Sequence, residues 1–334
     1  MLVSYFLQPF LEEDNSTLNY KQNLILKKHV KFVNYISKKY PIVDRLGKMP
    51  HFLPVHNMFP LPDMNKKKVL PYRDLTLSEA DKFIKTNRRI NVYWSGGIDS
   101  TSVIVSFLMA GIKLDQLHIT LTNKSIEEYP WFYHNIIDKK IQHSSPDKDI
   151  CQQLLDIPKD YLNVTGELVG VYFGGENKTL GDNRNYKDSY RNHMDADMIE
   201  FFEPMILASP RPIVSISDFK WAAKFYLWWQ YFYIRKFLLS DYHRDNTVHF
   251  GDNNLFQYWT LFTEEERADR KYMLRKLIFD FTKDIDYFNN KRPRQSIMSR
   301  INDDISGWSG SLTEKPISYT SSRVYLREGK YIIE

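Results

Sequence analysis

A glycine pair flanked by hydroxyl and carboxylate side chains is the segment of this sequence best suited to chemistry. The stretch INVYWSGGIDSTSVIVSFL, from Ile90 to Leu108, places Gly96 and Gly97 between an apolar run and an apolar-periodic segment. Paired glycines let a backbone approach a ligand closely, and the N-terminus of a following helix attracts phosphate. The segment therefore predicts a phosphate-binding loop.

The polar side chains around the glycine pair are of two kinds. Ser95, Ser100 and Thr101 offer hydroxyl groups, whereas Asp99 places a carboxylate where an anion would bind. Such a carboxylate fits if a divalent cation bridges it to phosphate oxygens. The residues alone also allow a second interpretation, a tight strand–helix turn in which Asp99 and Ser100 cap the helix.

Hydrophobic patterns predict the elements that would position this loop. Residues 90–94 form a β-favouring run, and residues 100–111 have helical spacing that ends at Gly111. Two more β-favouring runs follow, at residues 114–122 and 161–166. Strands alternating with helices at this spacing favour an α/β fold with a parallel sheet.

The rest of the chain divides around this α/β part. Residues 1–88 are expected to form an extension with helical and proline-rich segments, including a helix opened by Thr76 and Glu79 in capping-box spacing. Residues 195–245 are expected to be helical and largely buried. Residues 296–334 form a tail whose end is expected to make a hairpin or edge strand.

Composition excludes several classes of protein. The 334 residues are 43% hydrophobic and 26% charged, which is typical of globular proteins. A net charge of +5 permits a nucleic-acid partner without favouring one. The single cysteine, Cys151, excludes a disulfide framework and multi-cysteine metal sites. Without a recognisable signal peptide or a membrane-spanning apolar run, the chain is expected to be cytoplasmic and not membrane-bound.

The string SGGIDST lacks the lysine and spacing of a Walker loop and resembles the SGGxDS loop of the ATP pyrophosphatases. Members of that superfamily cleave ATP to AMP and pyrophosphate while they activate a substrate as its adenylate. The resemblance implies that Asp99 holds Mg²⁺ against the phosphates of ATP. It also implies an adenine nucleotide alpha hydrolase-like core, in which the loop follows the first strand of a parallel sheet.

Three later segments resemble the synthetase domain of asparagine synthetases in particular. TGELVGVYFGG resembles the family's SGEGADExFGG segment and assigns its glutamate to Glu167, near the reacting carboxylate and ammonia. RKYMLRKLI resembles K-x-x-L-R-E and assigns the ATP-phosphate lysine to Lys271 and the arginine to Arg275. HFGDNNLFQYW resembles PFLDxxLxEF and assigns the family's aspartate to Asp252.

This resemblance covers residues 89–295 and implies a large helical C-terminal portion. It implies Glu167 and Lys271 as catalytic residues, ATP and Mg²⁺ as cofactors, and a small carboxylate with ammonia or an amine as substrates. Adenine is expected near Leu121, Thr122 and Asn123, at the carboxyl end of a strand. The expected nucleotide contacts are Ser95, Gly96, Gly97, Asp99, Ser100, Thr101, Leu121, Lys271, Arg275 and Lys291.

Two departures from the family pattern change what is expected. A second metal-binding aspartate of the family aligns with Gly170, so another carboxylate, such as Glu176 or Asp182, would have to assist the cation. Leu2 stands where asparagine synthetases have a catalytic cysteine, and residues 1–88 are too few for a glutaminase domain. Nitrogen is therefore expected from ammonia, an amine or a separate donor protein. Stand-alone proteins of this kind are common in phages, which would place this one in the host cytoplasm.

Each assigned residue also has a structural interpretation. Glu167 and Asp252 could be turn residues, Lys271 and Arg275 a solvated basic helix face, and Lys291 part of a basic loop. His118 is interpreted as a hydrogen-bonded core residue of its strand. Two rival functions stay open: an enzyme that adenylates a nucleic-acid base, and a weakened ATP-binding or interaction module. Thiolation is disfavoured because Cys151 is alone.

Overall fold

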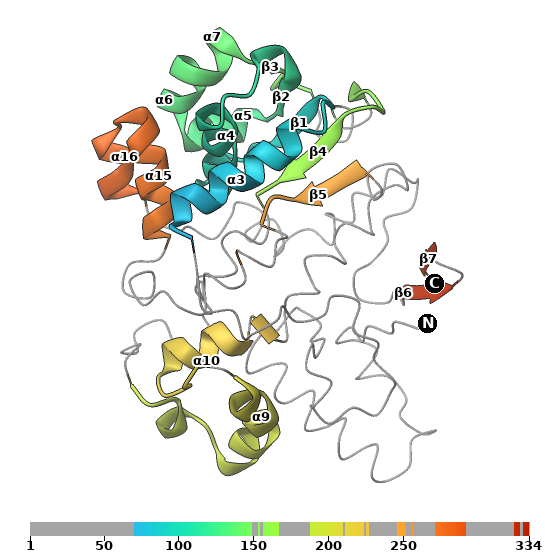
Figure 1. The fold of residues 1–334 in the computed structure, drawn as a ribbon. Helices are drawn as coiled ribbons and strands as arrows, with labels where there is room; N and C mark the ends of the chain where they lie inside the picture. The colour runs from blue at the N-terminus through green and yellow to red at the C-terminus, as the bar shows by residue number, and fades with distance from the viewer. Residues whose placement is uncertain are drawn as a thin grey trace.

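A computed structural model provides the structure of the chain. It describes residues 70–148, 153, 156–166, 188–209, 211–223, 225–226, 246–251, 256, 271–291, 324–327 and 330–333 (Figure 1). None of the helices among these residues is long and apolar enough to span a membrane.

The central element is a five-stranded sheet in the order β3-β2-β1-β4-β5, and all its strand pairs are parallel. Its strands are β1 (Ile90–Tyr93), β2 (Leu117–Thr120), β3 (Gln142–His143), β4 (Leu162–Thr165) and β5 (Thr247–His249). The predicted α/β class with a parallel sheet is confirmed, as are the three predicted strands. The short strands β3 and β5 were not predicted.

Helices and short turns connect and flank these strands. The α-helices are α3 (Tyr72–Ile84), α4 (Ile98–Met109), α5 (Asn123–Glu128), α6 (Pro130–Phe132), α7 (Asp138–Lys140), α9 (Ala196–Ala208), α10 (Ile216–Ala223), α15 (Tyr272–Thr282) and α16 (Ile285–Asn290). Shorter elements are the 3-10 turns η1 (Leu114–Gln116) and η5 (Tyr190–His193) and the π-turn η2 (Tyr133–Ile137). Strands β6 (Val324–Arg327) and β7 (Lys330–Ile333) pair antiparallel, which confirms the C-terminal hairpin.

The sheet has two chemically different faces, because side chains alternate along each strand and the register keeps like residues together. The aliphatic face of strands β1, β2, β4 and β5 consists of Ile90, Val92, Leu117, Ile119, Leu162, Val164 and Val248. The polar face of the same strands consists of Asn91, Tyr93, His118, Thr120, Asn163, Thr165, Thr247 and His249.

Hydrogen bonds connect neighbouring strands across the polar face. The Oδ1 of Asn91 accepts hydrogen bonds from His118 Nδ1 and from Thr120 Oγ1, both at 2.8 Å. Its Nδ2 donates to the Oδ1 of Asn163 at 2.9 Å. The prediction that His118 is a hydrogen-bonded residue of its strand is therefore confirmed. Burial, together with the nearby charges of His143 and Arg89, lowers the pKa of His118 from 6.5 to about 4.

The aliphatic face belongs to one core with three helices. Helix α4 contacts both α3 and α15, and buried residues of all three lie in the same cluster as β1 and β2 (Figure 1). Phe107 of α4 is fully buried and packs against Phe83 and Phe250, with ring centroids 6.1 and 5.6 Å apart. Such a buried aromatic side chain contributes roughly 1.5–3 kcal/mol. The core thereby fixes α4, whose N-terminus follows the glycine pair.

Helix α3 begins earlier than the sequence predicted. Its first residue is Tyr72, with Pro71 at the N-cap, so Thr76 and Glu79 lie inside the helix and do not form a capping box. Thr76 Oγ1 instead donates to the Arg73 carbonyl at 2.8 Å. The helix extends to Tyr72 because this side chain is buried in the core. The predicted domain boundary at residue 88 stays a prediction, although α3 shares the core of the sheet.

A second hydrophobic cluster involves α9 and α10, which lie in the region predicted to be helical. Phe202 and Phe219 pack edge to face at 5.1 Å in this cluster. A buried ion pair joins Arg211 Nη2 to Asp218 Oδ1 at 2.6 Å, and Asp218 Oδ2 accepts hydrogen bonds at the start of α10. The rest of this predicted helical region, residues 227–245, lies outside the described residues.

Candidate functional site

The glycine pair forms the connection between β1 and α4. Gly96 has a φ of 74°, in the left-handed region that favours glycine. A Cβ on Gly96 would lie 2.3 Å from the carbonyl oxygen of Ser125 and 2.6 Å from the Cβ of Glu128. Gly96 therefore lets the loop turn sharply while its backbone lies against α5.

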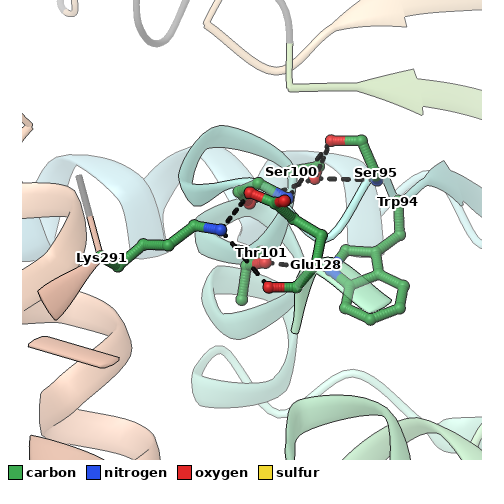
Figure 2. Close-up of polar contacts among 7 residues, drawn as sticks. Trp94, Ser95, Ser100, Thr101, Glu128 and Lys291 are labelled. Carbon is green, nitrogen blue, oxygen red and sulfur yellow. Dashed lines mark hydrogen bonds and ion pairs between the residues drawn. The ribbon is translucent and has the colours of Figure 1, made fainter. Parts of the chain in front are cut away.

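Hydroxyl groups hold this loop in shape. The backbone N–H of Ser95 donates to Ser100 Oγ at 3.1 Å, and the two serine hydroxyls are also 3.1 Å apart (Figure 2). The N–H of Gly97 donates to Ser95 Oγ at 3.3 Å. Thr101 Oγ1 accepts from the indole N–H of Trp94 at 2.9 Å. The predicted loop residues thus form one hydrogen-bonded unit.

The N-terminus of α4 has the chemical features of an anion-binding site. Gly97 is its N-cap, and among the described residues no side chain caps the first turn with a hydrogen bond. The alternative in which Asp99 and Ser100 cap this helix is therefore wrong. A helix of this length has N–H groups without intrahelical partners at its N-terminus and a partial positive charge there. Both features favour an anion.

The loop also lies where ligands bind in open parallel sheets. Strands β2 and β3 lie on one side of β1, and β4 and β5 on the other, so the strand order reverses between β1 and β4. Gly166, directly after β4, approaches the first turn of α4. A Cβ on Gly166 would lie 2.8 Å from the Ser100 nitrogen and 2.9 Å from the Asp99 carbonyl carbon. Sequence reasoning did not single out Gly166, although the TGE string contained it.

Asp99 and Lys271, each assigned separately from the sequence, contact one another. The Nζ of Lys271 lies 2.5 Å from Asp99 Oδ2. Lys271 precedes α15 with a φ of 59°, an uncommon conformation for a residue other than glycine. Strain of this kind concentrates at functional sites. The interpretation of Lys271 and Arg275 as a solvated basic face is wrong, because Lys271 is paired and Arg275 is buried.

A magnesium ion brought with the phosphates of ATP fits the chemistry of Asp99. In the described structure the Oδ1 of Asp99 is buried without a hydrogen-bond partner, and carboxylate oxygen is a ligand that Mg²⁺ prefers. No group of three or more His, Cys, Asp or Glu side chains that could hold a metal occurs in the described part of the chain. These residues therefore fit a cation whose other ligands are phosphate oxygens and water.

Arg275 connects the two helices that follow Lys271. It is 2% exposed, donates from Nη1 to the Phe288 carbonyl at 2.8 Å, and lies 5.6 Å from the centre of the Phe288 ring. Through this contact Arg275 ties α15 to α16. Its expected contact with the phosphates of ATP stays a prediction.

Lys291, at the C-terminal end of α16, reaches the glycine loop from another direction. Its Nζ forms an ion pair with the carboxylate of Glu128 and lies 3.4 Å from the Glu128 carbonyl oxygen (Figure 2). Glu128 is the last residue of α5, and the side chain of Glu128 lies against Gly96. Sequence reasoning missed Glu128, because no motif or spacing distinguishes it from its exposed neighbour Glu127.

Two stacked phenols support the contact between α16 and the segment after α5. The rings of Tyr129 and Tyr287 are 3.8 Å apart, and Tyr129 donates to Asp284 Oδ2 at 3.1 Å. Burial raises the pKa of both phenols above its ordinary value, so both stay protonated. The stack places Lys291, four residues after Tyr287, beside Glu128.

The expected adenine position lies at the carboxyl end of β2. Leu121 is buried directly after this strand, and its N–H donates to Ser144 Oγ at 3.4 Å. Thr122 caps α5 in a capping box with Ser125, and Asn123 begins that helix. Whether adenine binds here stays a prediction.

Several assigned residues lie outside the described residues. They are Cys151, Glu167, Gly170, Glu176, Asp182 and Asp252. The described part of the site therefore consists of the loop, the start of α4, Gly166, and the two lysine–carboxylate pairs.

Comparison with protein-family models and with curated proteins adds no relative. No protein-family model matches this chain, and no curated protein matches it. The resemblance to the ATP pyrophosphatases thus depends on the sequence motifs. The geometry of the loop is a separate observation.

Proposed function

We propose that this chain is an ATP-dependent synthetase of the asparagine synthetase type, built on an ATP pyrophosphatase core. It adenylates a substrate carboxylate, forms AMP and pyrophosphate, and transfers ammonia or an amine to the activated carboxylate. The observation that supports this most directly is the contact of Lys271 with Asp99, at 2.5 Å beside the glycine loop. Two residues that the motifs assign to one ATP site are thus in contact.

In the proposed first step, an oxygen of the substrate carboxylate attacks the α-phosphorus of ATP. The bond from that phosphorus to the bridging oxygen breaks, and pyrophosphate leaves with the negative charge. The uncapped N-terminus of α4 and the ammonium of Lys271 would stabilise this charge as it develops. Mg²⁺ held between Asp99 and the phosphates would supply further positive charge.

In the proposed second step, ammonia or an amine attacks the carbonyl carbon of the acyl-adenylate, and AMP leaves. Glu167 would orient the amine or take its proton. The nitrogen would come from free ammonia, from an amine on a second substrate, or from a separate donor protein. We further propose a cytoplasmic location, in the host cell if the chain is phage-encoded.

The test is to incubate the protein with ATP, Mg²⁺ and ammonia together with pools of amino acids, and to measure AMP and pyrophosphate. Asp99→Asn removes the carboxylate with little change in volume. Asp280→Asn is the control, because Asp280 pairs with Lys276 within α15. Pyrophosphate formed with one acid, lost in Asp99→Asn and kept in the control, is the expected result.

Two other results would replace this proposal. Release of AMP only when tRNA or DNA is present would identify an enzyme that adenylates a nucleic acid. Tight ATP binding without any turnover would identify a nucleotide-binding module.

A further inference from the structure

Glu128 brings a second carboxylate to the glycine loop. Its Cβ and Cγ would lie 2.6 and 3.0 Å from a Cβ placed on Gly96. Its side chain is 17% exposed, and that of its partner Lys291 is 11% exposed. A carboxylate fixed this close to an anion-binding loop opposes the binding of phosphate, so its position needs a chemical reason.

Glu128 and Lys291 form a lysine–carboxylate ion pair beside the loop, as Asp99 and Lys271 do. In each pair, a carboxylate from an element that contacts the loop holds a lysine from the C-terminal helices. Asp99 belongs to the first turn of α4, and Glu128 ends α5. Lys271 and Lys291, the two lysines expected to contact the phosphates, are therefore both held by carboxylates.

The charges of these four side chains cancel, since two ammonium groups face two carboxylates. If the lysines alone turned toward a polyphosphate, both carboxylates would be left facing its negative charges. Like charges at such close range repel strongly even at the effective dielectric constant of a protein surface. A divalent cation that arrives with the polyphosphate removes this repulsion.

We propose that Glu128 is a positioning residue that keeps Lys291 beside the loop, and that the release of Lys291 to the phosphates depends on the divalent cation that accompanies them. Lys291 leaves Glu128 and Lys271 leaves Asp99 for the phosphate oxygens, while the cation neutralises the carboxylates. This inference rests on the proposed ATP site and adds the role of Glu128 in controlling Lys291.

The test measures binding of α,β-methylene-ATP, whose α–β bridge cannot be cleaved, by calorimetry in Mg²⁺ and again in EDTA. The ratio of the two dissociation constants is the readout, because a purely structural contact does not change it selectively. For the wild type we expect Mg²⁺ to tighten binding by about tenfold or more, within the usual range for coupled sites. Circular dichroism melting checks that each variant is folded.

Two variants of the same pair separate the roles. Glu128→Gln frees Lys291 and removes a negative charge, so it tightens binding of the metal-free analogue several-fold and lowers the ratio. Lys291→Gln removes the positive charge and leaves the carboxylate, so it weakens metal-free binding. Glu127→Gln, at the exposed neighbour of Glu128, is the control and leaves the ratio unchanged.

If Glu128→Gln and Lys291→Gln change the ratio in the same direction, the pair is only a structural tie between α5 and α16, and the inference is wrong. A wild type that binds the analogue equally well with and without Mg²⁺ also overturns the inference but leaves the ATP site standing. A folded wild type that binds the analogue under neither condition refutes the proposed function itself.

Discussion

Gly166 lies so close to Ser100 that a Cβ on Gly166 would stand 2.8 Å from the Ser100 amide nitrogen. The carboxyl end of β4 thus touches the first turn of α4, although α4 follows β1 in the chain. Because the next nearest atom, the Asp99 carbonyl carbon, is 2.9 Å away, only backbone movement could make room for a side chain.

Replacement of Gly166 should therefore damage the site through packing. We expect Gly166→Ala to cost about 1–3 kcal/mol, the usual range for overpacking, and to weaken nucleotide binding. Gly111→Ala is the matched control, because Gly111 has a φ of 79° but no atom within 4 Å of its Cβ position. It should cost about 1–2 kcal/mol from left-handed strain alone. Urea unfolding and calorimetry measure both quantities, and unchanged nucleotide binding in Gly166→Ala would contradict this account.

Loss of Arg275 should affect stability more than ligand affinity. Arg275→Met removes a charged donor to the Phe288 carbonyl and should cost about 1.5–3 kcal/mol. Lys276→Met, at a partly exposed neighbour whose ion pair in the described structure is with Asp280 of the same helix, should cost less than about 0.5 kcal/mol. Thermal melting measures the difference. A variant that melts normally but loses nucleotide would instead assign Arg275 to the phosphates.

His118 should make stability depend on pH. Its pKa is about 4 in the folded protein against an ordinary 6.5, so between these values the unfolded chain binds more protons. The free energy of unfolding should therefore fall as the pH drops from 6.5 toward 4, by up to about 1.4 kcal/mol per pH unit from this group. His118→Asn keeps a donor toward Asn91 and should remove that contribution. Urea unfolding at several pH values measures it, with exposed His134→Asn as a control that should match the wild type.

Asn91 and Asn163 should be energetically coupled. Each is fully buried and they share a hydrogen bond, so replacing both by alanine should cost less than the sum of the single replacements. We expect a coupling of about 0.5–3 kcal/mol, the usual range for contacting residues. Asn192, exposed in η5 beside the second cluster, should combine additively with Asn91. Additive behaviour of Asn91 and Asn163 would mean that their hydrogen bond contributes nothing net.

The parts of the fold that the sequence predicts are those with local patterns. Strands β1, β2 and β4 and helix α4 each have an apolar run or period of their own. Strand β5 has three residues and β3 has two, which is too short for a period to be visible. The start of α3 was missed because Tyr72 is held by tertiary burial, which no capping pattern indicates.

The candidate site divides in the same way. The motifs indicate the loop, Asp99 and Lys271, but the contact between the last two joins residues separated by 172 positions. Glu128 could not be found from the sequence at all, because its role depends on the position of Lys291, 163 residues later. Long-range pairing of single charged residues leaves no local signature.

The two faces of the sheet also specify how its strands align during folding. A shift of β1 by one residue against β4 would bring Asn91 among the aliphatic side chains and Val92 among the amides and hydroxyls. Such a misaligned sheet loses hydrogen bonds on one side and apolar packing on the other. The alternation of Ile90, Asn91, Val92 and Tyr93 thus makes a shifted register unfavourable on both faces of the sheet. It also fixes the position of the end of β1, where the glycine loop begins, relative to the neighbouring strands.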